Sequence, residues 1–127
     1  MSIRVSIVED DDEVRQSLAV LLNGSEGFQC ISNHRSAEEA LEAIPKDPPD
    51  VVLMDINLPR LSGVECVRQL KDRVPTLKFL MLTMYEDSNL IFQSLGAGAS
   101  GYLLKRTPPA KIMEAIQELH EGGAPMS

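Results

Sequence analysis

Short runs of apolar residues alternate along this chain with segments in which apolar residues recur every three or four positions. A short unbroken apolar run is typical of a strand that helices cover on both faces. The run at residues 51–55 is the clearest, because four apolar residues end abruptly in a carboxylate. The predicted strands are Ile3–Val8, Phe28–Ile31, Val51–Asp55, Thr76–Leu82 and Ser100–Leu104.

The segments between these strands have the apolar spacing of helices and the residue types that begin them. Helices are expected after the acidic run 9–13, after Ser36, after the loop 57–63, after Asp87 or Ser88, and from Pro108-Pro109 onward. Four of the apolar faces are Val14, Leu18, Leu21 and Leu22; Ala37, Ala40, Leu41 and Ile44; Val64, Val67 and Leu70; and Ile112, Ile116 and Leu119. Five strands alternating with five helices predict a parallel sheet in one three-layer α/β sandwich.

Composition narrows the classes of function. At 127 residues the chain is the size of one domain. Its net charge of −7 disfavours nucleic-acid binding by this segment, because a polyanion would be repelled. No apolar run approaches the ~20 residues of a membrane span and no signal peptide precedes the first strand, so a cytoplasmic protein is expected. Cys30 and Cys66 are interpreted as ordinary apolar residues, and His34 and His120 as solvated surface residues.

Reactive side chains follow four of the predicted strands at the point where each strand ends. They are Glu9 and Asp10, Asp55, Thr83, and Lys105. Because the carboxyl ends of parallel strands meet at one edge of the sheet, these side chains are expected to converge in one crevice. Each of these residues alone could simply belong to a turn or to the solvated surface. The prediction of a functional site therefore rests on their occurring together at the ends of four strands.

A cluster of carboxylates requires a cation, since two of them 4 Å apart repel by about 4 kcal/mol at an effective dielectric of 20. Hard oxygen ligands suit Mg²⁺. The predicted ligands are Glu9, Asp10 and Asp55, with the backbone carbonyl of Asn57 as a further one. Lys105 and Thr83 would then bind a second anion at Asp55. A phosphoryl group is the expected anion and phosphoryl transfer to the protein is the expected reaction class.

Motifs spread over nearly the whole chain resemble the receiver domain of two-component response regulators. They are Ile7-Val8-Glu9-Asp10-Asp11, Leu53-Met54-Asp55-Ile56-Asn57-Leu58-Pro59 with Ser62-Gly63, Leu82-Thr83, and Gly101-Tyr102-Leu103-Leu104-Lys105. The resemblance implies a flavodoxin-like sheet with strand order 2-1-3-4-5. It also implies a signalling switch, not a turnover enzyme.

The resemblance assigns a role to each residue of the crevice. Asp55 is the implied phosphoacceptor for a histidine kinase, and Glu9, Asp10 and the Asn57 carbonyl are the implied Mg²⁺ ligands beside it. Thr83 and Lys105 are implied to contact the phosphoryl group. In the family the threonine is coupled to an aromatic residue on the fifth strand, here Tyr102, and the switched face comprises the fourth helix, fifth strand and fifth helix.

The end of the chain resembles the NarL/FixJ class, whose receivers precede a DNA-binding helix-turn-helix domain. We therefore expect a receiver domain at residues 1–121 and, at residues 122–127, the start of a linker to an output domain missing from this chain; a free-standing receiver remains an alternative. The class implies homodimers on phosphorylation and DNA binding only through the output domain.

Three positions depart from the commonest pattern of the family. Glu9 stands where many receivers have Asp, and Arg106 where many have Pro. Met84 stands where a small residue is usual, and with Tyr85 it is expected to modulate access to the acyl phosphate. The corresponding hypothesis is slow phosphotransfer or a long-lived phosphoryl state.

Three other functions are compatible with parts of this pattern. A haloacid dehalogenase-type phosphatase needs a second Asp as general acid where this chain has Asn57. A flavodoxin-like cofactor binder needs a Gly-rich phosphate loop where this chain has an acidic run. A receiver-like interaction module that works without phosphorylation is disfavoured because every reacting group is present, and it stays open.

Overall fold

The structure of the protein is a computed structural model that describes residues 2–126. Strands and helices alternate along the described chain, as the apolar pattern predicts. In order they are β1 (Ile3–Val8), α1 (Asp12–Asn23), β2 (Phe28–His34), α2 (Ala37–Ala43), a 3-10 turn (Ile44–Lys46), β3 (Val51–Asp55), α3 (Gly63–Arg73), β4 (Lys78–Thr83), α4 (Ser88–Ala97), β5 (Gly101–Leu104) and α5 (Pro109–His120).

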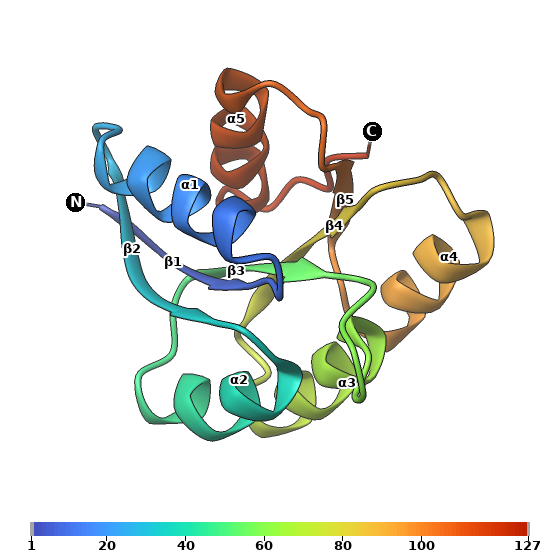
Figure 1. Ribbon diagram of the computed structural model, residues 1–127. Helices are drawn as coiled ribbons and strands as arrows, with labels where there is room; N and C mark the ends of the chain where they lie inside the picture. The colour runs from blue at the N-terminus through green and yellow to red at the C-terminus, as the bar shows by residue number, and fades with distance from the viewer. Residues whose placement is uncertain (1, 127) are drawn as a thin grey trace.

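The strands form one parallel sheet in the order β2-β1-β3-β4-β5, which confirms the predicted fold. Helices α1 and α5 cover one face of the sheet, and α2, α3 and α4 cover the other (Figure 1). Successive apolar side chains of each central strand therefore enter two separate cores. Leu53 packs with α1 and α5, whereas its neighbour Met54 packs on the side of α2 and α3.

Polar side chains fix where the helices begin. The carboxylate of Asp11 accepts hydrogen bonds from the backbone N–H groups of Glu13 and Val14, and Ser36 and Asp87 cap α2 and α4 in the same way. Each cap satisfies backbone donors that have no partner within the helix. The predicted helix starts are confirmed, and the Asp11 carboxylate caps α1, as expected.

Strand β2 runs three residues further than predicted, and this extension changes the interpretation of His34. Residue 34 pairs with Val8 at the end of β1, and its side chain is only 8% exposed. The prediction that His34 is solvated is wrong, because pairing with β1 turns the imidazole inward, where its Nε2 lies 3.0 Å from Ser32 Oγ. Burial lowers the pKa of His34. His120 is exposed, as predicted.

The segment after α5 folds back along the free edge of β5. The Tyr102 backbone N–H donates to the Pro125 carbonyl oxygen at 3.0 Å, and Pro125 is buried. The division at residue 121 stays a prediction, with Met1 and Ser127 outside the described residues. Among residues 2–126, no helix combines the length and the apolar character that crossing a membrane demands.

Gly63 allows the loop after β3 to return against the end of that strand. A Cβ atom on Gly63 would overlap the Asp55 carbonyl oxygen, whereas a Cβ atom on Gly96 in α4 would meet nothing within 4 Å. We predict that Gly63→Ala lowers the free energy of unfolding by about 2–3 kcal/mol through overpacking. The matched Gly96→Ala should raise it by roughly 0.5–1 kcal/mol. Urea unfolding measures both, and equal effects would contradict the close approach at Asp55.

Candidate functional site

The parallel register brings the predicted reactive residues to one edge of the sheet. Asp55 pairs with Leu82 at the ends of β3 and β4. Thr83 pairs with Leu104, and the backbone N–H of Lys105 donates to the Thr83 carbonyl oxygen at 2.8 Å. Because the ladder fixes these ends side by side, residues more than ninety positions apart in sequence share one site.

Three carboxylates form the centre of this site. Ligand oxygens of Glu9, Asp10 and Asp55 all lie within 4.8 Å of one another. Glu9 and Asp55 are 0% and 2% exposed, whereas Asp10 lies at the surface. The Lys105 ammonium lies 2.8 Å from Glu9 Oε1 and 3.1 Å from Asp55 Oδ2. The three carboxylates and the lysine therefore lie together as the sequence predicts, and their roles stay predictions.

Backbone groups orient the two buried carboxylates. Asp55 Oδ1 accepts a hydrogen bond from the Asn57 N–H at 3.0 Å, and Glu9 Oε2 accepts one from the Asp11 N–H at 3.1 Å. Glu9 Oε1 is paired with the Lys105 ammonium, which it shares with Asp55 Oδ2. One cation within residues 2–126 therefore serves two buried carboxylates.

Burial and like charge disturb the protonation of the site. Burial raises the pKa of Glu9 to about 7, the Lys105 partner opposes the rise, and the nearby Asp55 adds to it. Burial acts to lower the pKa of Lys105, but Glu9 and Asp55 outweigh it, so that pKa is raised. The ammonium therefore stays charged, while the buried Glu9 carboxyl resists ionisation near neutral pH.

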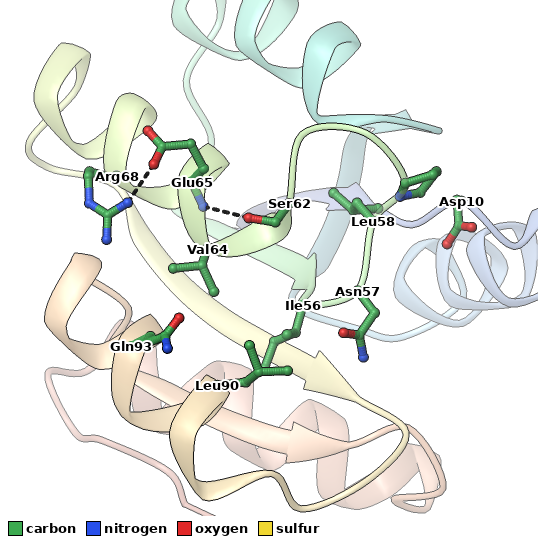
Figure 2. Close-up of a pocket in the computed structure, with 11 residues that line it drawn as sticks. Asp10, Ile56, Asn57, Leu58, Ser62, Val64, Glu65, Arg68, Leu90 and Gln93 are labelled. Atoms are coloured by element: carbon green, nitrogen blue, oxygen red, sulfur yellow. Dashed lines mark hydrogen bonds and ion pairs between the residues drawn. The ribbon is translucent and has the colours of Figure 1, made fainter.

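The donor set fits a hard divalent cation. It consists of carboxylate oxygens with no His or Cys, and the exposed Asp10 leaves one side open to water, as Mg²⁺ prefers. Asp10 and Asn57 also line one end of a groove of about 440 Å³ whose other end holds Arg68 and Gln93 (Figure 2). The Asn57 carbonyl as a metal ligand stays a prediction.

Of the predicted switch residues, Thr83 lies at the same sheet edge as the cluster and Tyr102 lies further back along β5. Thr83 is 2% exposed, and its hydroxyl donates to the Tyr85 carbonyl oxygen at 2.9 Å. Met84 and Tyr85 are 54% and 74% exposed in the loop that follows β4. Tyr102 is half-buried against the core that α3 and α4 share. In this structure the Thr83 hydroxyl therefore binds its own loop.

Two residues that support Glu9 were missed by sequence reasoning. Arg15 of α1 is 6% exposed and donates from Nη1 to the Glu9 carbonyl oxygen at 2.9 Å. The His34 carbonyl oxygen accepts the Glu9 backbone N–H at 3.0 Å. A signal for Arg15 was available, because it precedes Leu18 and Leu22 by three and seven residues and so lies on their buried face.

Comparisons with known proteins identify the family. The chain matches the response regulator receiver domain over residues 5–117. It is 42% identical over 121 residues to the transcriptional regulatory protein LnrK of Bacillus subtilis, covering 95% of this chain and 55% of that protein. It is 36% identical over 122 residues to the transcriptional regulatory protein DegU of Brevibacillus brevis, covering 96% and 52%. The chain thus spans about half the length of these curated relatives.

Solved structures agree with the sequence comparisons. A LuxR-family two-component response regulator from Aurantimonas sp. superimposes with a TM-score of 0.94 at 30% identity, covering 100% of this chain and 91% of that one. The chain therefore belongs to the response regulator receiver domain family, as its motifs predict. Receiver domains of this family are signalling switches.

The raised pKa of Glu9 predicts how pH changes the stability of the metal-free protein. A carboxyl group with a higher pKa in the folded state binds protons more tightly there, so its stabilising effect is greatest below its ordinary pKa of 4.5 and is lost as pH rises through about 7. Between pH 5 and 8 the free energy of unfolding of the wild type should therefore fall by about 2 kcal/mol relative to that of Glu9→Gln.

Urea unfolding of both proteins across this pH range measures the difference. Mg²⁺ should restore the stability of the wild type at pH 8, because a ligand that binds only the folded state raises the free energy of unfolding. If the free energies of unfolding of the two proteins changed with pH in parallel, ionisation of Glu9 would not destabilise the folded state, and the prediction would be wrong.

Proposed function

We propose that this receiver accepts a phosphoryl group from a histidine kinase on Asp55, in a Mg²⁺-dependent reaction. The observation that supports the proposal best is the buried Asp55 carboxylate, which shares the Lys105 ammonium with Glu9 at the end of the sheet. A third acidic residue of the cluster, Asp10, is exposed at the surface.

The residues present can perform each part of the transfer. One oxygen of Asp55 attacks the phosphorus atom of a phosphohistidine, an O–P bond forms, and the P–N bond breaks with its electron pair passing to the imidazole nitrogen. Lys105 Nζ, now paired with Asp55 Oδ2, donates to a phosphoryl oxygen. Mg²⁺ held by Glu9, Asp10, Asp55 and the Asn57 carbonyl would supply charge neutralisation at the phosphoryl oxygens.

The new anion provides a physical means of switching. The Thr83 hydroxyl leaves the Tyr85 carbonyl oxygen and donates to a phosphoryl oxygen, which moves the loop after β4. Tyr102 then turns toward the position that this loop vacates. Because Tyr102 also pairs through its backbone with Pro125, the change in α4, β5 and α5 extends to the segment after α5.

The output is inferred from the relatives. Two of them are transcriptional regulatory proteins about twice the length of this chain. We infer that phosphorylation promotes homodimerisation and controls a DNA-binding region beyond residues 122–127, in the cytoplasm. The net charge of −7 is consistent with DNA contacts outside the receiver.

Replacement of the acceptor carboxylate should abolish phosphorylation. Incubated with Mg²⁺ and acetyl phosphate, the wild type should gain one phosphoryl group by intact-protein mass spectrometry, and Asp55→Asn should gain none because an amide is not nucleophilic. Asp72→Asn, which changes an exposed carboxylate on α3, is the matched control and should label as the wild type does. A chelator should prevent labelling.

Labelling of Asp55→Asn at the wild-type rate would place the acceptor elsewhere. A wild type that neither acetyl phosphate nor its cognate kinase labels, beside a control receiver that is labelled, would favour the interaction module that works without phosphorylation.

Shortening Met84 should open the site. Met84→Ala removes a side chain next to Thr83, and we predict that labelling by acetyl phosphate and loss of the phosphoryl group both accelerate by roughly 3- to 10-fold, equivalent to about 1 kcal/mol of barrier. Phe92→Ala, which truncates an exposed side chain on α4, is the control. Time courses of intact mass give both rates, and unchanged rates would rule out Met84 as an obstacle.

A further inference from the structure

We infer that Arg15 is a positioning residue for the cation site, because its guanidinium holds the peptide bond that joins Glu9 to Asp10. The inference rests on the proposed function in that it takes these two carboxylates as cation ligands. Arg15 belongs to α1, and the two carboxylates directly follow the last residue of β1. The arginine therefore links a helix to the acidic end of the neighbouring strand.

The contacts of Arg15 use two arms of its guanidinium. Nη1 donates to the Glu9 carbonyl oxygen at 2.9 Å, and Nη2 donates to Asp12 Oδ1 at 2.5 Å. The Asp12 carboxylate is largely exposed, whereas the Arg15 side chain is only 7% exposed. The planar fork thus has one end fixed by a carboxylate and the other directed at one backbone carbonyl.

Both backbone groups of Glu9 are fixed by groups outside β1. Its N–H donates to the His34 carbonyl oxygen at the end of β2, and its carbonyl oxygen accepts from Arg15. The peptide plane between Glu9 and Asp10 therefore cannot rotate without breaking a buried hydrogen bond. Glu9 and Asp10 flank this peptide bond in the sequence, so the orientation of the peptide affects the relative position of their two carboxylates.

Positioning and simple charge have opposite consequences for cation binding. If Arg15 acted only as a nearby positive charge, its removal would tighten binding of Mg²⁺, because repulsion would fall and Asp12 would lose its neutralising partner. If it positions the peptide, its removal weakens binding. Loss of a residue that orients metal ligands typically lowers metal affinity by roughly 10- to 100-fold.

The chain contains a matched control for this arginine. Arg4, near the start of β1, also donates to one carbonyl and one carboxylate, those of Pro48 and Asp47 at 3.1 and 2.8 Å. It lies five residues before Glu9, about 17 Å along an extended strand. Arg4→Met thus removes the same kind of contact away from the site.

Isothermal titration calorimetry with Mg²⁺ tests the inference without phosphorylation. For Arg15→Met and Arg15→Lys the dissociation constant should rise by about 10-fold or more, and for Arg4→Met it should stay at the wild-type value. The lysine variant keeps the charge but lacks the fork, so weaker binding there cannot arise from charge. In acetyl phosphate labelling of the two Arg15 variants, the Mg²⁺ concentration that gives half the maximal rate should rise by the same factor as the dissociation constant. The rate at saturating Mg²⁺ should stay within roughly threefold of the wild-type rate.

Unchanged or tighter Mg²⁺ binding by folded Arg15→Met, or wild-type affinity in Arg15→Lys, would overturn the inference. Circular dichroism establishes folding, and if the methionine variant does not fold, the lysine variant decides. A wild type that binds no Mg²⁺ also overturns it. A wild type that binds Mg²⁺ without becoming labelled would refute only the proposed function, because the calorimetric comparison still distinguishes the two roles of Arg15.

Discussion

The structure depends on two buried carboxylates that share one ammonium group at the carboxyl edge of the sheet. Glu9 and Asp55 both contact Lys105, and the exposed Asp10 adds a further negative charge. Burial of charge without full compensation is unfavourable, and the raised pKa of Glu9 expresses that cost. A cation bound between these carboxylates would relieve the unfavourable charge and, under the function proposed above, would let a second anion approach Asp55.

Much of the surrounding structure limits how these charges can relax. The parallel ladder places Asp55 beside the end of β4, and Gly63 lets the following loop pack directly on the Asp55 carbonyl. Arg15 and the His34 carbonyl hold the backbone of Glu9 from the other side. Because these supports come from separate elements, the cluster can form only when the sheet and α1 are both assembled. The loop carrying Met84 and Tyr85 is exposed by comparison, so few packing contacts oppose its movement.

Local chemistry explains which predictions from sequence succeeded. Unbroken apolar runs marked the buried strands, and Asp11, Ser36 and Asp87 marked helix starts because each side chain bonds to backbone groups two or three residues away. The reactive cluster was predictable because strand ends in a parallel sheet share one edge. The predictions were less successful for β2, a strand at the edge of the sheet, whose polar residues 32–34 pair with β1 although they lack an apolar pattern.

The sequence by itself determined the fold class, the family and which polar side chains meet at the edge of the sheet, since periodicity, capping and the order of residues along the strands are local properties. Only the tertiary structure decided that Arg15 and the His34 carbonyl hydrogen-bond to the backbone of Glu9 and that the Thr83 hydroxyl binds the Tyr85 carbonyl oxygen. These contacts depend on where one element lies relative to another. A polar group can reach several partners, and the sequence does not show which of them it will contact. Burial and pairing of polar groups are set by the assembled structure, because their cost depends on every neighbour that replaces water.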